Sequence, residues 1–447
     1  MKRITVAVLL LMSFTTRYGG QQTPSRPTVL EHVTVINAGS APMSDMTILI
    51  TGSRIVAVDR ADATTIPTGA QIIDGRGKFV IPGLMDMHHH LLNGSFPPRP
   101  GGIQANLGRL LAVGVTTVFD PSIGRQDFAR LKAAAAPDSS AYARFFGTGP
   151  MFTVKGDTFA DADSPMPETP AQAEAAVNDL KALGVDAIKI QRDDLSWAIK
   201  GSGTLMPLEV LAAVVKQAHT QGLKVYAHAP LLKLAKEALS VGVDGLMHGI
   251  VDEPVDAEFL GLMKKNGAVY VPTLALFEDV ADVAAFARRQ AVNWDRAKLQ
   301  PPAIYAPFAD AAGARQIESF LNNSAFTKER LKVARANVKR VFDAGVPVVL
   351  GTDTGFFGVF LGVATQIELE LLVEAGLTPA EALRAATINA ARMIGKERDL
   401  GTIEAGKFAD LVILDADPLA DIRNVVRIYK VIKGGVQYEP VDPATPR

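Results

Sequence analysis

Residues 80–90 have the sequence Val-Ile-Pro-Gly-Leu-Met-Asp-Met-His-His-His, an apolar run that ends in three of the chain's seven histidines. Side chains two residues apart share a face of an extended strand, so we expect His88 and His90 to point together and His89 to point away. Two imidazoles on one face are the start of a metal site, since such a site takes about four ligands. The stretch therefore predicts a buried strand that ends at a metal.

The composition is that of an ordinary globular protein. The chain has 447 residues, 48% of them hydrophobic, and a formal net charge of -1, which allows one large domain and a smaller one. With no basic stripe, nucleic acid is not an expected partner. The sequence contains no cysteine, so a transition-metal site must use histidine, carboxylate or a modified lysine.

The first residues have the pattern of a secretory signal. A basic start, Met1-Lys2-Arg3, precedes an apolar stretch from Ile4 to Met12, which is too short to span a bilayer as a helix. We interpret residues 1–25 as a signal peptide with an open cleavage position. A disordered leader is the alternative. The expected location is periplasmic or secreted, with no membrane segment after cleavage.

Both ends of the chain consist of short β-rich runs broken by turn residues. They cover residues 26–80 and 397–440. Neither end is large enough to bury a core alone, so we expect the two to form one small β-sandwich domain. The centre, residues 81–396, is then an insertion between its halves.

The centre alternates Ala- and Leu-rich amphipathic stretches with short β-branched runs. Eight runs are expected to be strands, namely 79–90, 113–119, 143–147, 183–190, 221–228, 241–248, 266–272 and 344–353. Eight strands with helices between them predict an α/β fold, a (β/α)8 TIM-like barrel. A doubly wound sheet is the alternative, although no glycine-rich dinucleotide loop is present. We expect residues 279–335 to form helical cover over the site.

Polar side chains interrupt the buried runs near their C-terminal ends. They are His88, His90, Lys189, His228, His248 and Asp353. Barrel active sites form at these strand ends, so the six side chains should meet at one mouth. Burial of an unpaired charge is costly, and a lysine inside an apolar strand therefore needs a compensating role. A single histidine would more simply be structural, but six converging polar groups favour a metal site.

With these motifs the chain resembles the amidohydrolase superfamily, in particular its imidazolonepropionase-like and prolidase-like branch. The matching motifs are Pro82 to His90, Ile188-Lys189-Ile190, Ala227-His228-Ala229, Met247-His248-Gly249, Gly351-Thr352-Asp353-Thr354, and residues 386–391 and 400–411. The resemblance implies two divalent metals, with zinc expected first and manganese, iron or cobalt also suitable. His88, His90 and Asp353 would bind one metal, and His228 and His248 the other.

The resemblance further implies that Lys189 bridges the metals after carboxylation by CO2. Carbamate formation needs a neutral amine, which an apolar strand end favours. A lysine that only pairs with a carboxylate is the alternative. A hydroxide shared by the metals would attack the amide bond of a small substrate, such as a dipeptide or an N-acyl amino acid. Asp353 would be the catalytic proton carrier.

The sequence indicates the type of reaction more clearly than it indicates the substrate. The chain departs from prolidase-like relatives at Met247, at Gln191-Arg192-Asp193-Asp194 and at Phe119-Asp120, all of which lie around the pocket. Arg192 and Tyr226 are candidates for holding a substrate carboxylate, although Tyr226 could equally be a packing residue. Ester, lactone or cyclic-amide hydrolysis, a non-catalytic metal-binding protein, and a homo-oligomer all stay open.

Overall fold

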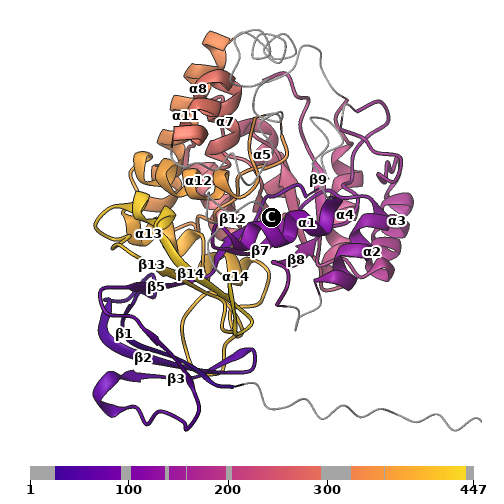
Figure 1. The fold of residues 1–447 in the computed structure, drawn as a ribbon. Helices are drawn as coiled ribbons and strands as arrows, with labels where there is room; N and C mark the ends of the chain where they lie inside the picture. Colours follow the sequence, from indigo (N-terminus) through magenta and orange to yellow (C-terminus); the bar gives the residue numbers. More distant parts are fainter. Residues whose placement is uncertain are drawn as a thin grey trace, which may run out of the picture.

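The computed structural model describes residues 26–91, 102–135, 140–157, 159–197, 204–292, 324–356 and 358–438. These residues form a mixed α/β fold in which helices surround two parallel sheets and a third, larger sheet lies at one end (Figure 1). The expected α/β class is confirmed. The signal-peptide prediction falls on residues 1–25, which lie outside the described residues.

The larger sheet combines strands from both ends of the chain, in the order β15-β14-β13-β5-β1-β2-β3, with β4 paired to β1. Its strands are β1 (Thr28–Val35), β2 (Met43–Thr51), β3 (Arg54–Arg60), β4 (Gln71–Asp74), β5 (Phe79–Pro82), β13 (Leu411–Leu414), β14 (Ile428–Lys433) and β15 (Val436–Tyr438). The two ends meet where β13 pairs antiparallel with β5. Their shared apolar core includes Val33, Ile48 and Ile413. All eight strands belong to one hydrogen-bonded sheet, where a two-layered sandwich was expected.

The centre contains two parallel sheets. Their strands are β6 (Leu84–Asp86), β7 (Val115–Asp120) and β8 (Arg144–Gly147) in one, and β9 (Ala187–Gln191), β10 (Lys224–His228), β11 (Gly245–Leu246) and β12 (Val269–Tyr270) in the other. Isolated parallel bridges connect Phe152 with Ile190, Tyr270 with Val348, and His89 with Thr354. The run 344–353 takes part only through the bridge at Val348 and nearby hydrogen bonds, so the described residues contain no closed eight-stranded barrel.

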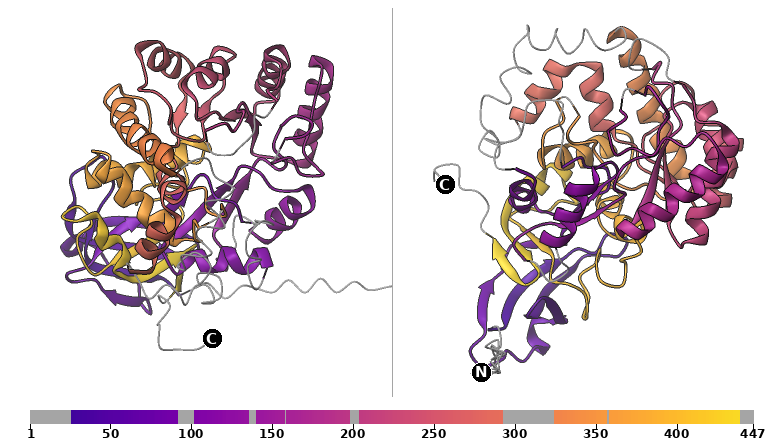
Figure 2. Two further views of the ribbon diagram at one scale, coloured as in Figure 1. Left: turned by 90° about the horizontal axis from the view of Figure 1, so that it is seen from above. Right: turned by 90° about the vertical axis from the view of Figure 1, so that its right-hand side faces the viewer.

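Helices alternate with the central strands and lie on their outer side (Figures 1 and 2). They are α1 (Gly102–Leu111), α2 (Arg125–Ala134), α3 (Pro170–Leu183), α4 (Leu208–Thr220), α5 (Leu232–Ser240), α6 (Ala257–Asn266), α7 (Leu274–Ala281), α8 (Val283–Val292), α11 (Ser324–Asp343), α12 (Val363–Glu374), α13 (Pro379–Ala385) and α14 (Ile388–Met393), with 3-10 turns η1 (Ala61–Ala63) and η3 (Ile422–Val426). Among the described residues, none of these helices has the length and apolar character that a membrane crossing requires.

The ends of α3 show how the sequence sets a helix boundary. Thr169 and Gln172 form a capping box, and Pro170 occupies the first turn, where its missing N–H costs nothing. Gly184 ends the helix in the left-handed region, with φ 85, a conformation that glycine adopts without a Cβ clash. The chain then turns directly into β9, which carries Lys189.

The two faces of β9 have different surroundings. Ile188 and Ile190 belong to the main core, which packs the strands against the helices. Ala187 instead belongs to an inner cluster that also contains Tyr226. Lys189 lies two residues after Ala187 and therefore points inward, among the ends of the neighbouring strands.

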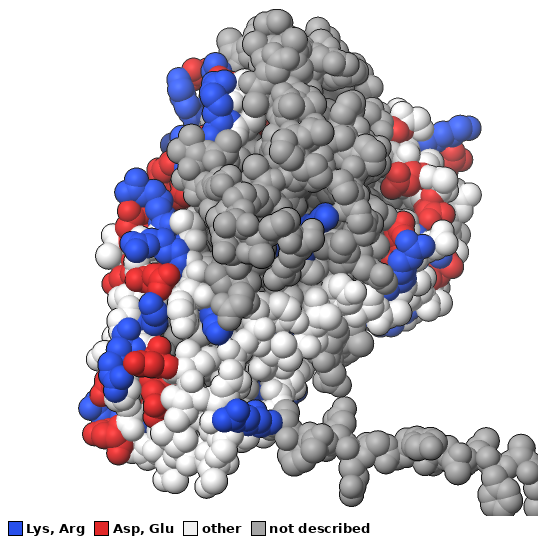
Figure 3. All heavy atoms as spheres, in the orientation of Figure 1, with Lys and Arg blue, Asp and Glu red and all other residues white. Residues whose placement is uncertain are grey.

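The charges on the outer surface are mixed. On the face shown in Figure 3, Lys and Arg side chains are interspersed with Asp and Glu side chains along both margins of the molecule. The described residues on that face form no large patch of one sign.

Candidate metal centre

His88, His90 and Asp353 converge on one point. Asp353 Oδ1 lies 3.2 Å from His88 Nε2 and 3.0 Å from His90 Nε2. The three residues can each offer one ligand atom within 4.8 Å of the others. Atoms that each lie about 2.1 Å from one divalent ion are roughly 3 Å apart, so the observed spacing suits a metal site.

The backbone around Asp353 holds its carboxylate against the histidines. Asp353 has φ 60, a left-handed conformation that Asp tolerates better than most residues. Its N–H donates to the His88 carbonyl over 2.7 Å. The turn thus ties the end of the run 344–353 to the strand that carries His88.

The other two predicted histidines lie beside this group. The ring centroids of His228 and His248 are 4.3 Å apart, and those of His248 and His88 are 4.6 Å apart. His228 Nε2 is 2.8 Å from Asp193 Oδ2, and His248 Nδ1 is 2.9 Å from Thr273 Oγ1. Each ring therefore uses one nitrogen for a protein contact, and the second nitrogen is the one that can bind a metal.

Lys189 lies in the same electrostatic neighbourhood. Its side chain is buried, and burial lowers its pKa to about 7 against the opposing charges of Asp353 and Asp120. Its own charge contributes to lowering the pKa of His88. The structure thus brings His88, His90 and Asp353 within ligand distance of one another, with the rings of His228 and His248 beside them and Lys189 near enough for its charge to act on His88.

The protonation states of the ligands differ. Burial lowers the pKa of His88 to about 3, which keeps that ring neutral and able to bind a cation. For His90 burial acts in the same direction, but Asp120 and Asp353 outweigh it and raise the pKa to about 10. Burial opposes ionisation of Asp353, yet His88 and His90 hold its pKa well below the usual range. A metal entering here would displace the His90 proton.

The amidohydrolase family model matches residues 79–437. The chain belongs to the amidohydrolase family. An imidazolonepropionase of Alkaliphilus metalliredigens (strain QYMF) is 24% identical over 424 residues, which cover 88% of this chain and 90% of that protein. The crystal structure of a candidate prolidase from Bifidobacterium longum has a TM-score of 0.76 and 28% identity over 95% of this chain and 97% of that one. A Xaa-Pro dipeptidase crystallised with bound methionine has a TM-score of 0.70 and 25% identity over 92% of this chain and 100% of that one.

These matches confirm the predicted superfamily and branch. They also confirm that the protein is a hydrolase of the class that acts on C–N bonds. The three residues that converge on one point make it an amidohydrolase with a candidate metal site. The number and identity of the metals stay predictions.

Three residues that contact the ligands were not predicted. Asp120 Oδ1 lies 3.4 Å from His90 Nδ1, and Asp193 and Thr273 contact the histidines of the second pair. A carboxylate at the end of an apolar run is a signal that could have identified Asp120. Asp193 and Thr273 lie beyond the ends of their strands, and their roles depend on loop geometry.

In this amidohydrolase the two predicted substrate contacts have other partners. The Tyr226 hydroxyl donates to the Met393 carbonyl over 2.8 Å in the inner apolar cluster. Arg192 Nε donates to Glu237 Oε2 over 3.1 Å, and its terminal nitrogens contact Glu237 and the Met206 carbonyl. Tyr226 therefore acts as a packing residue. Arg192 connects the end of β9 to α5 through its ion pair with Glu237. The substrate-binding roles stay predictions without structural support.

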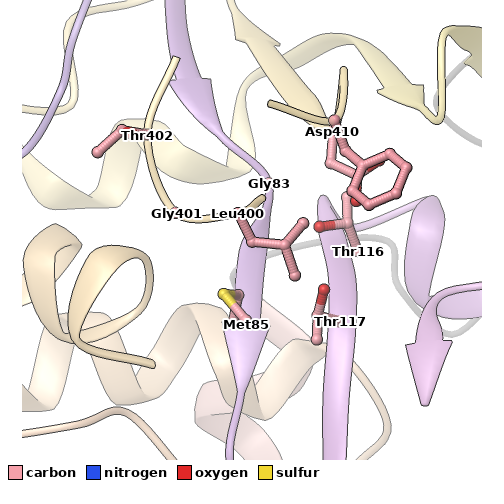
Figure 4. Close-up of a pocket in the computed structure, with 9 residues that line it drawn as sticks. Gly83, Met85, Thr116, Thr117, Leu400, Gly401, Thr402 and Asp410 are labelled. Carbon is pink, nitrogen blue, oxygen red and sulfur yellow. The ribbon is translucent and has the colours of Figure 1, made fainter. Parts of the chain in front are cut away.

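A small cavity lies away from the histidines, near the start of β6 and β7 (Figure 4). It is lined by Gly83, Met85, Thr116, Thr117, Leu400, Gly401, Thr402, Phe408 and Asp410. None of the six candidate ligands lines it. We interpret it as a packing gap between the central strands and the C-terminal segment, and not as the substrate site.

Proposed function

We propose that this amidohydrolase holds two divalent metals, zinc in the first instance, and cleaves the amide bond of a small substrate such as a dipeptide or an N-acyl amino acid. The observation that carries the proposal is the convergence of Asp353 Oδ1 on His88 Nε2 and His90 Nε2, with the second histidine pair beside it. No serine or cysteine nucleophile is required.

The proposal includes a (β/α)8 barrel as the frame of the site. Three parallel bridges support it. They join Phe152, in the segment after β8, to Ile190 in β9, Tyr270 in β12 to Val348, and Thr354 to His89. A barrel places all C-terminal strand ends at one mouth. That mouth is where we propose that the six ligands meet.

Asp353 is suited to carry the proton of the reaction. When bound, the two metals would polarise the scissile carbonyl and make a water nucleophilic near neutral pH. The Asp353 carboxylate stays ionised because the neighbouring histidines keep its pKa low. It would accept a proton from the attacking water and deliver it to the leaving nitrogen.

Lys189 would become an anionic ligand. Its neutral amine would attack CO2. An N–C bond forms as one C=O π bond opens onto oxygen, and the proton released from the nitrogen passes to solvent water, so a carbamate with two oxygens replaces a buried cation. The low pKa of the amine supports this step. The carbamate would then have oxygens available for both metals.

The relatives favour two substrate types. The likeness to a candidate prolidase and a Xaa-Pro dipeptidase supports a linear amide. The likeness to an imidazolonepropionase supports a cyclic amide, because the name of that enzyme refers to an imidazolone ring. We propose the linear amide because the structural matches cover slightly more of both chains. The proposed location is periplasmic or secreted.

A combined metal and activity experiment tests the proposal. Purified protein is analysed for metal content and assayed against dipeptides, N-acyl amino acids, cyclic amides and lactones. We expect two metals per chain, hydrolysis of at least one linear amide, and loss of both metal and activity in Lys189→Ala. Fewer than two metals, with Lys189→Ala fully active, would contradict the bridged pair.

Carboxylation has its own measurement. In 13C NMR with labelled bicarbonate, a carbamate signal should appear at about pH 8, where an amine with a pKa near 7 is mostly neutral. The signal should be absent in Lys189→Arg, which keeps the charge but cannot be carboxylated. A signal of equal size in both proteins would exclude Lys189 as its source.

A further inference from the structure

We propose that Asp193 and Trp197 form a positioning device for His228. Asp193 Oδ2 lies 2.8 Å from His228 Nε2 and 2.7 Å from the indole Nε1 of Trp197. The Asp193 side chain is fully buried, and that of His228 is 12% exposed. One carboxylate oxygen therefore links a strand-end histidine to a tryptophan in the loop after β9.

The carboxylate is held from several sides. Its other oxygen, Oδ1, accepts the N–H of Leu195 over 3.1 Å, and Leu195 itself has φ 60 in the left-handed region. Trp197 is 4% exposed and packs edge-on against Phe277, with ring centroids 5.4 Å apart. With both oxygens engaged, the Asp193 side chain has little freedom to rotate.

This geometry selects one form of the histidine. An indole nitrogen only donates, and a carboxylate only accepts, so the Asp193 oxygen can take an N–H from both rings. His228 then carries its proton on Nε2, which leaves the Nδ1 lone pair for a metal. Asp193 also fixes the plane of the ring, which would otherwise rotate at the end of β10.

The neighbouring residue Asp194 offers a control for this role. Asp193 and Asp194 are adjacent, but the partly exposed Asp194 accepts the N–H of Ser196 and not a histidine proton. Asp194 is thus a matched control of the same residue type in the same loop. The inference rests on the proposed function, because it assumes that His228 binds a metal.

Metal titration of five proteins tests the device. Metal-free wild type, Asp193→Ala, Asp193→Asn, Trp197→Phe and Asp194→Ala are titrated with Zn2+ against a chromophoric chelator, and Co2+ forms are compared by visible absorption. We expect two sites in wild type and a roughly 10- to 100-fold weaker second site in Asp193→Ala. Asp193→Asn keeps an acceptor and should recover part of the affinity. Trp197→Phe should show a smaller loss, and Asp194→Ala none.

The outcomes separate the two proposals. A single site in wild type would refute the metal pair. The positioning argument then holds if Asp193→Ala weakens that one site and Asp194→Ala does not, and it fails if Asp193→Ala leaves the affinity unchanged. Two sites in wild type with unchanged affinity in Asp193→Ala would overturn the positioning argument alone. Equal losses in Asp193→Ala and Asp194→Ala would also overturn it, since they would reflect loop damage. If Asp193→Ala does not fold, an unchanged second site and Co2+ spectrum in Trp197→Phe overturn it instead.

Discussion

The hydroxyl oxygen of Thr273 lies 2.9 Å from His248 Nδ1, on a residue whose backbone is left-handed, with φ 48. A β-branched residue rarely adopts this conformation, which costs about 1–3 kcal/mol. The strain is held in place by Glu368 on α12, whose carboxylate accepts the N–H groups of Leu274 and Ala275 over 2.9 and 2.7 Å. The first turn of α7 is therefore fixed by α12 through Glu368.

We expect Thr273→Ala to weaken metal binding at His248. The substitution removes the oxygen that orients the ring together with the γ-methyl group, and the serine variant below separates the two losses. A loss of about 10-fold in metal affinity is expected, as for other contacts that orient a ligand. Zinc titration measures it. Thr273→Ser keeps the hydroxyl and should bind like wild type, so similar losses in both variants would contradict the orienting role.

Glu368→Gln should alter the pH dependence of stability. Burial raises the pKa of Glu368 from 4.5 to about 8, although two N–H donors oppose this. The folded protein binds this proton more tightly than the unfolded chain, so the stabilisation is fully present below about pH 4.5 and is lost as pH rises through about 8. The slope is at most about 1.4 kcal/mol per pH unit. The difference in Tm between wild type and Glu368→Gln should become smaller between about pH 5 and 8.5. Plots of Tm against pH that run parallel for the two proteins would contradict the raised pKa of Glu368.

The candidate ligands could be proposed from the sequence because each is a polar residue in, or just after, an otherwise apolar run. His88 and Lys189 are of this kind, and the cost of burying them already implies a function. Thr273 could not be predicted in the same way. Its contact depends on a left-handed turn and on Glu368, which lies 95 residues further along the chain. Sequence spacing carries no signal for such an arrangement.

The expected eighth strand illustrates a second limit. The run 344–353 has the β-branched residues of a strand, but it contains Pro347, which has no N–H to donate. Its pairing is reduced to the bridge between Val348 and Tyr270 and a few further hydrogen bonds. Hydrophobic pattern alone predicts the position of this segment next to β12, but not the loss of regular pairing.

Gly351→Ala should disturb the metal centre directly. A Cβ at this position would lie 2.5 Å from Val271 Cγ1, 2.7 Å from His88 Cβ and 2.9 Å from the His88 backbone nitrogen. These distances are too short for contacts to a carbon atom, so the backbone at His88 must move. Because protein interiors are closely packed, such a movement also displaces the neighbouring metal-binding side chains. We expect at least a 10-fold loss of metal affinity in zinc titration, in line with the precision that ligand geometry demands.

Gly261→Ala is the matched control for that substitution. Gly261 lies in α6, and an added Cβ would have no heavy atom within 4 Å. Alanine is the better helix former there, so the free energy of unfolding should rise by about 0.5–1 kcal/mol. Metal affinity should stay unchanged. A Gly351→Ala protein that binds zinc as tightly as Gly261→Ala would contradict the steric argument.

Asp410 should stabilise the contact between the large sheet and the central strands. Its carboxylate lies 2.8 Å from Arg144 Nε on β8 and 3.6 Å from Lys433 Nζ on β14, and all three side chains are nearly inaccessible. Asp410→Asn removes the buried carboxylate that faces both cations, and breaking a buried ion pair costs about 3–5 kcal/mol. Asp399→Asn removes the exposed ion pair with Arg54 and should cost at most about 1 kcal/mol. Thermal unfolding followed by circular dichroism should therefore show a far larger fall in Tm for Asp410→Asn, and equal shifts would mean that the buried triad contributes no more than a surface pair.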